Sequence, residues 1–154
     1  MAAFPGVTAV CSGAILSTYQ RTRIEAVCGR LGLLSLSPLW QRPQREVLDA
    51  MIAAGVDAAL VKTAGVGLTP QRHLGKTIGA LRAHFQELHD LYDFHVCGEG
   101  GEYETFTLDC PAFRRRIVLD ETEIVEGEGE GAGTLVIKAY HLEDKDDEEG
   151  AAGA

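Results

Sequence analysis

Glu99, Glu102 and Glu104 lie within six positions of one another, inside the segment HVCGEGGEYET at residues 95–105. Three carboxylates at the end of a buried strand can hold Mg²⁺, orient an amine or contact a cationic substrate. Gly100 and Gly101 let the main chain turn tightly there. If the chain is extended beyond Glu102, the carboxylates at 102 and 104 share one side and residue 103 faces the other. The alternative is a polar turn whose glutamates are solvated.

A second candidate site is the segment SGAILSTYQRTRIE at residues 12–25, where a strand is expected to end and a helix to begin. Main-chain amides at a helix start favour a phosphate, and arginine binds phosphate through a bidentate fork. Arg21 and Arg23 are therefore candidate phosphate ligands. In the alternative reading this is a solvated helix face, on which Arg21 pairs with Glu25 four residues later.

Smaller signals surround these two segments. Trp40, in PLWQRP, is either a core residue or a ring that stacks on a ligand. Lys62 ends an expected buried strand, where an ammonium group needs an anionic partner. None of the four cysteines has C-x-x-C spacing, so buried thiols are expected rather than a zinc or redox site. A catalytic role for Cys97 stays open because it borders the glutamates.

The elements that must position these residues alternate in type along the first two thirds of the chain. Short β-branched runs predict strands, and apolar residues at helical spacing predict helices. In chain order they are a strand at 7–11, a helix from about 18 to 31, a strand at 33–36, a helix at 43–54, a strand at 57–63, a helix at 78–92 and a strand at 94–97. This alternation favours a parallel sheet with right-handed crossovers. Strands at 103–108, 114–119 and 135–140 have no helices between them and predict an antiparallel addition, with a flexible loop at 127–133.

The predicted fold class is therefore α/β, a mostly parallel sheet with flanking helices plus an antiparallel carboxyl-terminal addition. The 154 residues suit one globular domain, expected over 1–143, with a disordered acidic tail at 144–154. The net charge is −9, but residues 1–119 carry 11 acids and 12 bases, so the acidity belongs to the last 35 residues. We find no basic nucleic-acid footprint, no apolar run of the ~18 residues that a membrane span needs, and no secretory signal. A cytoplasmic protein that binds neither nucleic acid nor membrane is expected.

Four segments, in this order, resemble diphthine–ammonia ligase, a family also called diphthamide synthase. They are GAILSTYQRTRIEAVCGRLGL, PLWQRPQREVLDAMIAAGVDAALVK, GLTPQRHLGKT and HVCGEGGEYETFTLDCPAF. The likeness extends from about Val10 to about Lys145, which is most of the chain. It implies an N-type ATP pyrophosphatase with an adenine-nucleotide α-hydrolase-like fold, of which this chain resembles the carboxyl-terminal part.

The resemblance also implies an activity, the ATP-dependent amidation of diphthine to diphthamide on elongation factor 2. ATP activates the diphthine carboxylate as an acyl-adenylate and releases pyrophosphate, and ammonia then displaces AMP. ATP and Mg²⁺ are the implied cofactors, and elongation factor 2 and ammonium the implied partners. On this sequence the implied nucleotide-binding residues are Ser12, Gly13, Ala14, Tyr19, Gln20, Arg21 and Arg23. Catalytic roles fall to Glu99, Glu102 and Glu104, and substrate contacts to Tyr103, Glu25, Trp40, Gly100 and Gly101, with no residue assigned as a metal ligand.

Several individual roles remain open. Arg21 and Arg23 would offset phosphate charge, with Mg²⁺ assisting through one or two glutamates. Either the carboxylate at 102 or 104, with Tyr103 and Trp40, contacts the trimethylammonium group of diphthine, or the carboxylate at 99 binds ammonium and accepts its proton. The family's amino-terminal S-G-G-K-D-S loop is not in this sequence, so we expect a truncated form. The alternatives are a non-catalytic fragment that binds a nucleotide or the elongation factor, and one half of a split enzyme.

Overall fold

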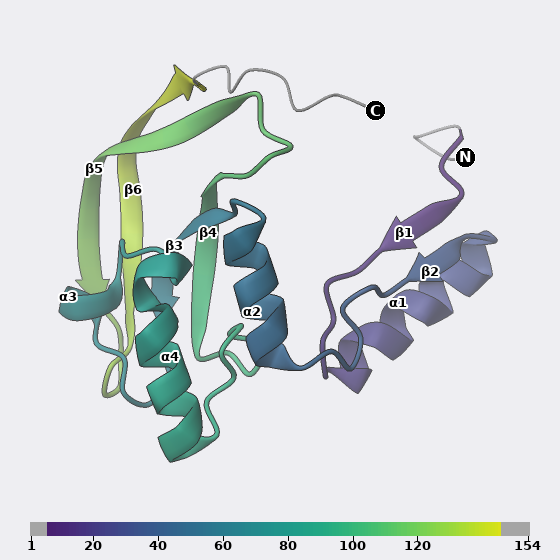
Figure 1. The fold of residues 1–154 in the computed structure, drawn as a ribbon, viewed down its shortest axis with the longest axis horizontal. Coiled ribbons are helices and arrows are strands. Elements are labelled where there is room, and N and C mark those ends of the chain that lie inside the picture. Colours follow the sequence, from purple (N-terminus) through teal and green to yellow (C-terminus); the bar gives the residue numbers. More distant parts are fainter. Residues whose placement is uncertain (1–5, 146–154) are drawn as a thin grey trace. The chain divides into compact units, whose positions relative to one another are not determined.

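A computed structural model describes residues 6–145. The chain divides between Val47 and Leu48 into two compact units, and each is described by itself (Figure 1). Among the described residues, no helix is long and apolar enough to cross a bilayer.

The first unit is a strand–helix–strand crossover. β1 (Ala9–Cys11) and β2 (Leu34–Leu36) pair in parallel, and α1 (Thr18–Leu31) connects them. The helix begins at a Ser17 cap, whose side chain accepts from the main-chain N–H of Gln20. It ends at Gly32, whose φ of 68° is the left-handed conformation that a helix stop requires. The strand, helix and parallel pairing predicted for this segment are confirmed.

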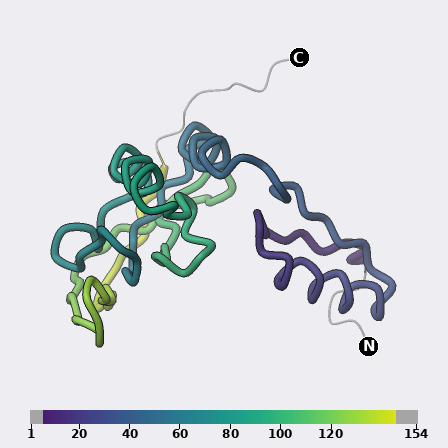
Figure 2. Tube along the Cα trace, turned by 90° about the horizontal axis from the view of Figure 1, so that it is seen from below, coloured from purple at the N-terminus to yellow at the C-terminus, as the bar shows by residue number. Residues whose placement is uncertain are grey.

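The second unit combines three helices with an antiparallel sheet. The sheet has the order β4-β3-β6-β5, and the elements in chain order are α2 (Gln44–Ala53), β3 (Asp57–Thr63), α3 (Pro70–His73), α4 (Ile78–Tyr92), β4 (Tyr103–Asp109), β5 (Arg115–Glu126) and β6 (Gly133–Asp144). In the tube view, α2 and α4 lie on the same side of these strands (Figure 2). Helix α2 crosses the division between the units, and its residues from Leu48 onward belong to the second.

The α/β class and the antiparallel addition are confirmed, with two corrections of detail. Among the strands of residues 6–145, parallel pairing is confined to β1 and β2, because β3 pairs antiparallel with both β4 and β6. The predicted strand at 94–97 is a turn that follows α4, which ends at Asp93 in the left-handed conformation (φ 56°). Phe94 and Val96 are apolar because they are buried in the core, where the ring of Phe94 lies 5.6 Å from that of Phe85. Their alternation with the less buried His95 and Cys97 has the period of a strand, although the segment pairs with no ladder partner among the described residues.

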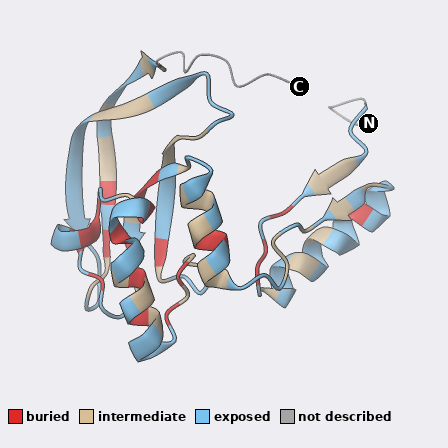
Figure 3. Ribbon diagram, viewed as in Figure 1, coloured by how far each residue is buried: buried red, intermediate tan, exposed pale blue. Residues whose placement is uncertain are grey.

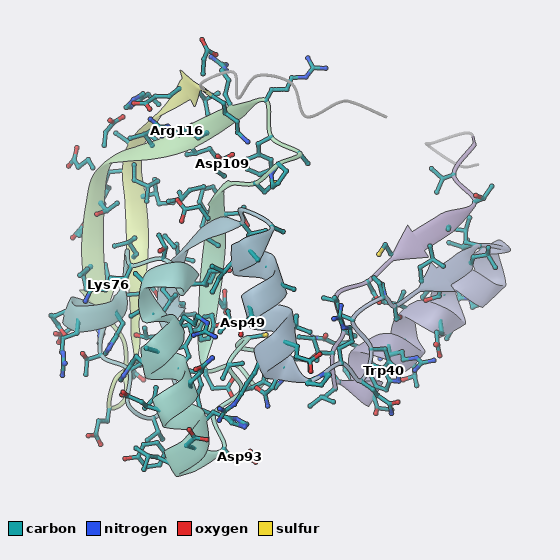
Figure 4. The ribbon with its side chains drawn as sticks, viewed as in Figure 1. Trp40, Asp49, Lys76, Asp93, Asp109 and Arg116 are labelled. Atoms are coloured by element: carbon teal, nitrogen blue, oxygen red, sulfur yellow. The ribbon has the colours of Figure 1, made fainter. Side chains whose placement is uncertain are left out.

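The core of the second unit lies between its helices and the sheet. Leu48 of α2, Leu60 of β3 and Phe85 of α4 are fully buried there. Figure 3 shows the buried positions on the helix faces that meet the sheet, whereas most of β5 and β6 is exposed. A bidentate pair of Arg82 on α4 with Asp49 on α2 bridges the two helices outside this core (Figure 4).

β5 and β6 form a hairpin that is longer than the predicted strands, with 12 residues in each. The predicted loop at 127–133 connects them, with Gly133 as the first residue of β6. Near the carboxyl end, Arg116 pairs with Glu143, and Lys145 forms an ion pair with Asp109 at 2.6 Å (Figure 4). The strand therefore includes residue 144, where the acidic tail was predicted to begin; residues 146–154 of that tail lie outside the described residues.

Candidate functional site

In the first unit, the loop that follows β1 is held against the end of β2. The main-chain N–H of Ser12 donates to the carbonyl of Leu36 at 2.9 Å, and its hydroxyl lies 3.2 Å from that of Ser37. Ala14 is buried, whereas a Cβ added at Gly13 would meet nothing within 4 Å. The loop predicted to bind a nucleotide therefore has a fixed main chain and open space at its glycine.

The arginines at the start of α1 lie on aromatic rings. The guanidinium of Arg21 lies 4.5 Å from the ring centroid of Trp40, and its Nε donates to Glu25 at 2.7 Å (Figure 4). The guanidinium of Arg23 lies 5.1 Å from the ring of Tyr19, which is itself 69% exposed. These contacts orient each guanidinium and leave it accessible. Gln20, the remaining predicted residue here, is exposed beside the Ser17 cap.

In the second unit, Glu99 and Glu102 lie in a turn at residues 95–102, here called the glutamate turn, and Glu104 follows it on β4. Its main chain is closed by Gly98 N–H to the carbonyl of His95 at 2.7 Å and by Gly101 N–H to the carbonyl of Gly98 at 3.1 Å. Both glycines have positive φ, 72° and 91°, which explains why the turn needs glycine there.

Glu102 is directed into the turn. Its Oε1 accepts from the main-chain N–H of His95 at 3.0 Å, and its carbonyl accepts from Ala64 and Gly65, each at 2.9 Å. A Cβ at Gly100 would lie 2.5 Å from Oε1, so this glycine makes room for the carboxylate. Glu102 thus acts as an internal anchor that joins the turn to the end of β3.

Glu99 and His95 form a mostly buried pair within the same turn. Each side chain is 12% exposed, and Oε2 of Glu99 lies 3.7 Å from Nε2 of His95. The other ring nitrogen, Nδ1, accepts from the main-chain N–H groups of Cys97 and Glu99, both at 3.3 Å. Sequence reasoning assigned no role to His95; its place two residues before Cys97 and four before Glu99 was the available signal.

Glu104 does not share a site with the other two carboxylates. It lies on β4 opposite Lys62 of β3 and accepts from the lysine Nζ at 2.7 Å. The two side chains are 62% and 49% exposed, so this is a surface ion pair of small energetic value. The pair supplies the anionic partner that was predicted for Lys62.

Tyr103 lies in the core, and the expected contact of its ring with a cationic substrate stays a prediction. It is 5% exposed, its ring lies 4.7 Å from that of Phe85, and its hydroxyl donates to the carbonyl of Val96 at 2.6 Å. Burial raises the pKa of the hydroxyl above its usual value. Tyr103 is the first residue of β4, and its hydroxyl contacts the turn through the Val96 carbonyl.

The glutamates do not fit a Mg²⁺ site in this arrangement. One carboxylate faces the main chain of His95, one lies against the ring of His95, and one pairs with Lys62. Over residues 6–145, no group of three or more histidine, cysteine, aspartate or glutamate side chains is placed to hold a metal ion. A hard cation of this kind needs several converging oxygen ligands.

Cys97 lies in the glutamate turn but lacks the properties of an activated nucleophile. Burial, with a smaller contribution from the charge of Glu99, raises the pKa of its thiol to about 11. A reactive cysteine needs the opposite shift, because the thiolate is the nucleophile.

The division between the two units agrees with the comparison with known proteins. The family model described as the diphthamide synthase N-terminal domain matches residues 4–35, and the model of the diphthamide synthase C-terminal domain matches residues 44–142. The second match contains the whole glutamate turn.

Curated relatives give the same result. The chain is 49% identical to the diphthine–ammonia ligase of Rattus norvegicus and 46% identical to that of Homo sapiens, in each case over 90% of this chain and 53% of the relative. It is 50% identical to the diphthine–ammonia ligase of Schizosaccharomyces pombe, over 88% of this chain and 22% of that protein. The chain thus spans about half the length of the animal relatives it matches. Since a family model covers most of its residues, the chain belongs to the diphthamide synthase family.

Proposed function

We propose that this chain takes part in the diphthine–ammonia ligase reaction, the ATP-dependent amidation of diphthine to diphthamide on elongation factor 2. The observation that carries the proposal is the match to the diphthamide synthase C-terminal domain over residues 44–142. That segment contains the glutamate turn, in which Glu99 and His95 are paired and mostly buried. The relatives that share it are named diphthine–ammonia ligases.

The proposed reaction has two steps. An oxygen of the diphthine carboxylate attacks the α-phosphorus of ATP, and pyrophosphate leaves. Ammonia then attacks the acyl carbon, AMP leaves with the bonding electron pair, and the nitrogen loses a proton to a base. The protein must therefore offset negative charge at the phosphates and supply a carboxylate or another base near the nitrogen.

The arginines of the first unit are suited to the phosphate contact. Arg21 and Arg23 hold their guanidinium groups on the faces of Trp40 and Tyr19, in the first two turns of α1. Trp40 and Glu25 then serve to orient Arg21 rather than to contact the substrate themselves. The fixed loop from Ser12 to Ala14 and the exposed Gln20 complete the proposed nucleotide-binding surface.

Among the three glutamates, we propose Glu99 as the one that binds ammonium and accepts its proton. Its carboxylate is mostly buried in the glutamate turn, with Oε2 at 3.7 Å from Nε2 of His95, so it is shielded from bulk water. The exposed carboxylate of Glu104 remains a candidate contact for the trimethylammonium group of diphthine. No step of this proposal runs through Mg²⁺, because the described side chains do not converge on a cation.

The proposal is tested by AMP formation from ATP by the purified 154-residue chain, given diphthine-bearing elongation factor 2, Mg²⁺ and ammonium. Ammonium-dependent AMP with conversion of diphthine supports it. Glu99→Gln should then lower kcat about 10²-fold or more, as expected for loss of a proton acceptor. Glu87→Gln is the matched control, because Glu87 is an exposed glutamate of α4 with 74% of its side chain accessible.

Nucleotide binding is tested separately through Trp40, the single tryptophan of the chain. If Arg21 leaves the Trp40 ring for a phosphate, ATP should change the tryptophan emission, and Arg21→Gln should abolish the change. Arg30→Gln is the control, since Arg30 lies in the last turn of the same helix. A folded chain that responds to ATP but forms no AMP would contradict catalysis by this chain alone and favour a nucleotide-binding fragment. Activity restored by the amino-terminal half of a relative would favour a split enzyme.

A further inference from the structure

We infer that His95 is a positioning residue of the glutamate turn: its ring accepts hydrogen bonds from the main chain and thereby fixes the place and direction of the Glu99 carboxylate. Within the proposed function, this carboxylate meets the ammonium. The hydrogen bonding of His95, however, can be tested whether or not that function holds.

Bonds from this one residue reach most of the turn. Its main-chain N–H donates to the carboxylate of Glu102, and its carbonyl accepts from Gly98. Its ring nitrogen Nδ1 accepts from the N–H groups of Cys97 and Glu99. The second of these bonds acts on the residue that carries the proposed catalytic carboxylate, so movement of the ring would move that residue.

The same bonds fix the tautomer of the ring. Since Nδ1 accepts two N–H groups, it carries no proton, and the ring proton lies on Nε2. Nε2 is buried, has no hydrogen-bond partner among the described residues, and lies 3.7 Å from Oε2 of Glu99. The ring therefore directs an N–H toward the side of the turn where the carboxylate lies. A small approach would complete this hydrogen bond and orient the carboxylate.

The hydrogen bonds at Nδ1 also exclude a role for His95 in proton transfer. The only lone pair that could accept a proton is at Nδ1, and that atom is occupied by main-chain donors. The ring cannot relay a proton from ammonium without breaking the bonds that hold the turn. His95 therefore acts through Glu99 and not on the substrate.

Two substitutions separate the hydrogen-bond acceptor from the rest of the ring. In His95→Asn, the side-chain oxygen is at the position of Nδ1 and can accept the same main-chain bonds. In His95→Gln, the oxygen is one carbon further out, near the position of Nε2, and cannot. If the inference is right, Asn preserves the turn and Gln does not, although both remove the imidazole.

The first measurement needs no activity. A ¹⁵N–¹H correlation spectrum of the intact chain should show the His95 proton on Nε2, and the amide protons of Cys97 and Glu99 should exchange slowly in the wild type and His95→Asn. In His95→Gln these two amides should exchange at least about 10-fold faster, because they lose their acceptor. A proton on Nδ1, or equal exchange in the two variants, would overturn the inference.

The second measurement uses the amidation assay. His95→Asn should keep kcat/KM for ammonium within about 3-fold of wild type, whereas His95→Gln should lose about 10- to 100-fold, the scale expected when a reacting group moves by about 1 Å. The KM for ATP should stay unchanged in both. A purely structural role would lower thermal stability without this selective loss, and that result would also refute positioning. If the wild-type chain forms no product, the proposed function of the chain fails, while the spectroscopic result still decides the role of His95.

Discussion

The Tyr103→Phe substitution removes one oxygen atom and separates two roles for this tyrosine. In the structure the hydroxyl donates to the carbonyl of Val96 at 2.6 Å, and the two residues are 5% and 0% exposed. The sequence prediction instead placed this ring in contact with a substrate cation. A core role predicts a loss of stability, and a substrate contact predicts a change in KM.

The magnitude follows from the burial of both partners. Phenylalanine keeps the stacking on Phe85 but leaves the Val96 carbonyl without its donor. An unsatisfied buried acceptor costs about 1–3 kcal/mol. For a unit of roughly 100 residues, each kcal/mol lowers Tm by about 4–8 °C. The urea midpoint should fall by about 1 M, since unfolding free energies of small proteins change by about 1–3 kcal/mol per molar urea.

Unfolding of the second unit should be followed by far-ultraviolet circular dichroism, because the tryptophan lies in the first unit. Tyr92→Phe is the matched control: Tyr92 is 57% exposed at the end of α4, and its substitution should leave the midpoint unchanged. Equal midpoints for Tyr103→Phe and the wild type would refute the core role. A raised KM for the diphthine substrate at unchanged stability would restore the prediction made from the sequence.

Three further predictions concern the same unit. Gly65→Ala should destabilise it by about 1–3 kcal/mol in thermal denaturation, because a Cβ there would lie 2.8 Å from the Cβ of Glu102. The contribution of His73 to stability should fall as the pH decreases below 6.5, the ordinary pKa of histidine, because burial lowers the pKa of His73 in the folded state. Because the unfolded chain binds the His73 proton more tightly than the folded chain does, protonation favours unfolding. The contribution of neutral His73 to stability is complete above the ordinary pKa of 6.5 and is lost as the pH falls toward the lowered pKa of the folded state. His73→Asn, which keeps an acceptor for the Thr69 N–H, should flatten this dependence in urea titrations between about pH 5 and pH 8. Cys97 should react slowly with iodoacetamide at about pH 8, because burial raises the pKa of its thiol to about 11; mass spectrometry of the digested chain measures the extent.

Each of these predictions has an internal comparison. Gly29→Ala places a Cβ with nothing within 4 Å and should not destabilise α1, so equal losses in the two glycine variants would argue against close approach as the cause. An unchanged pH dependence in His73→Asn would show that another group controls it. Cys11 is exposed and should be alkylated first; a Cys97 that reacts as fast would contradict its raised pKa.

Local signals were sufficient to predict most elements. Apolar spacing located α1 and α4, and their caps at Ser17 and Thr77 appear as side-chain acceptors of main-chain N–H groups. The partners of β3 could not be predicted, because alternation of strand and helix favours parallel pairing and says nothing of strands that join later in the chain. The strand at 94–97 was predicted for the same reason. The apolar types of Phe94 and Val96 indicate that both residues are buried, but they do not show whether a neighbouring strand pairs with them.

The candidate site shows the same limit. The ion pair of Arg21 with Glu25, expected in the alternative reading of that segment, is present in the structure, and Lys62 has the anionic partner that it was expected to need. The segment at 95–105 contains three glutamates that look equivalent in the sequence. Their separation into an internal anchor, a histidine pair and a surface ion pair depends on which main-chain and side-chain groups lie near each carboxylate, and those come from β3 and from the turn itself.

The way the β5–β6 hairpin joins its sheet has a consequence for folding kinetics. The two strands share eleven paired positions with each other, yet β6 meets β3 only at Thr134 and Gly133. The hairpin closes over a loop of a few residues, which is fast, whereas its pairing with β3 must bring together residues about 70 positions apart. A Cβ at Gly133 would collide with Pro70, so β6 can pair with β3 only if the residue that packs against α3 has no side chain. Docking at this junction should set the folding rate of the unit.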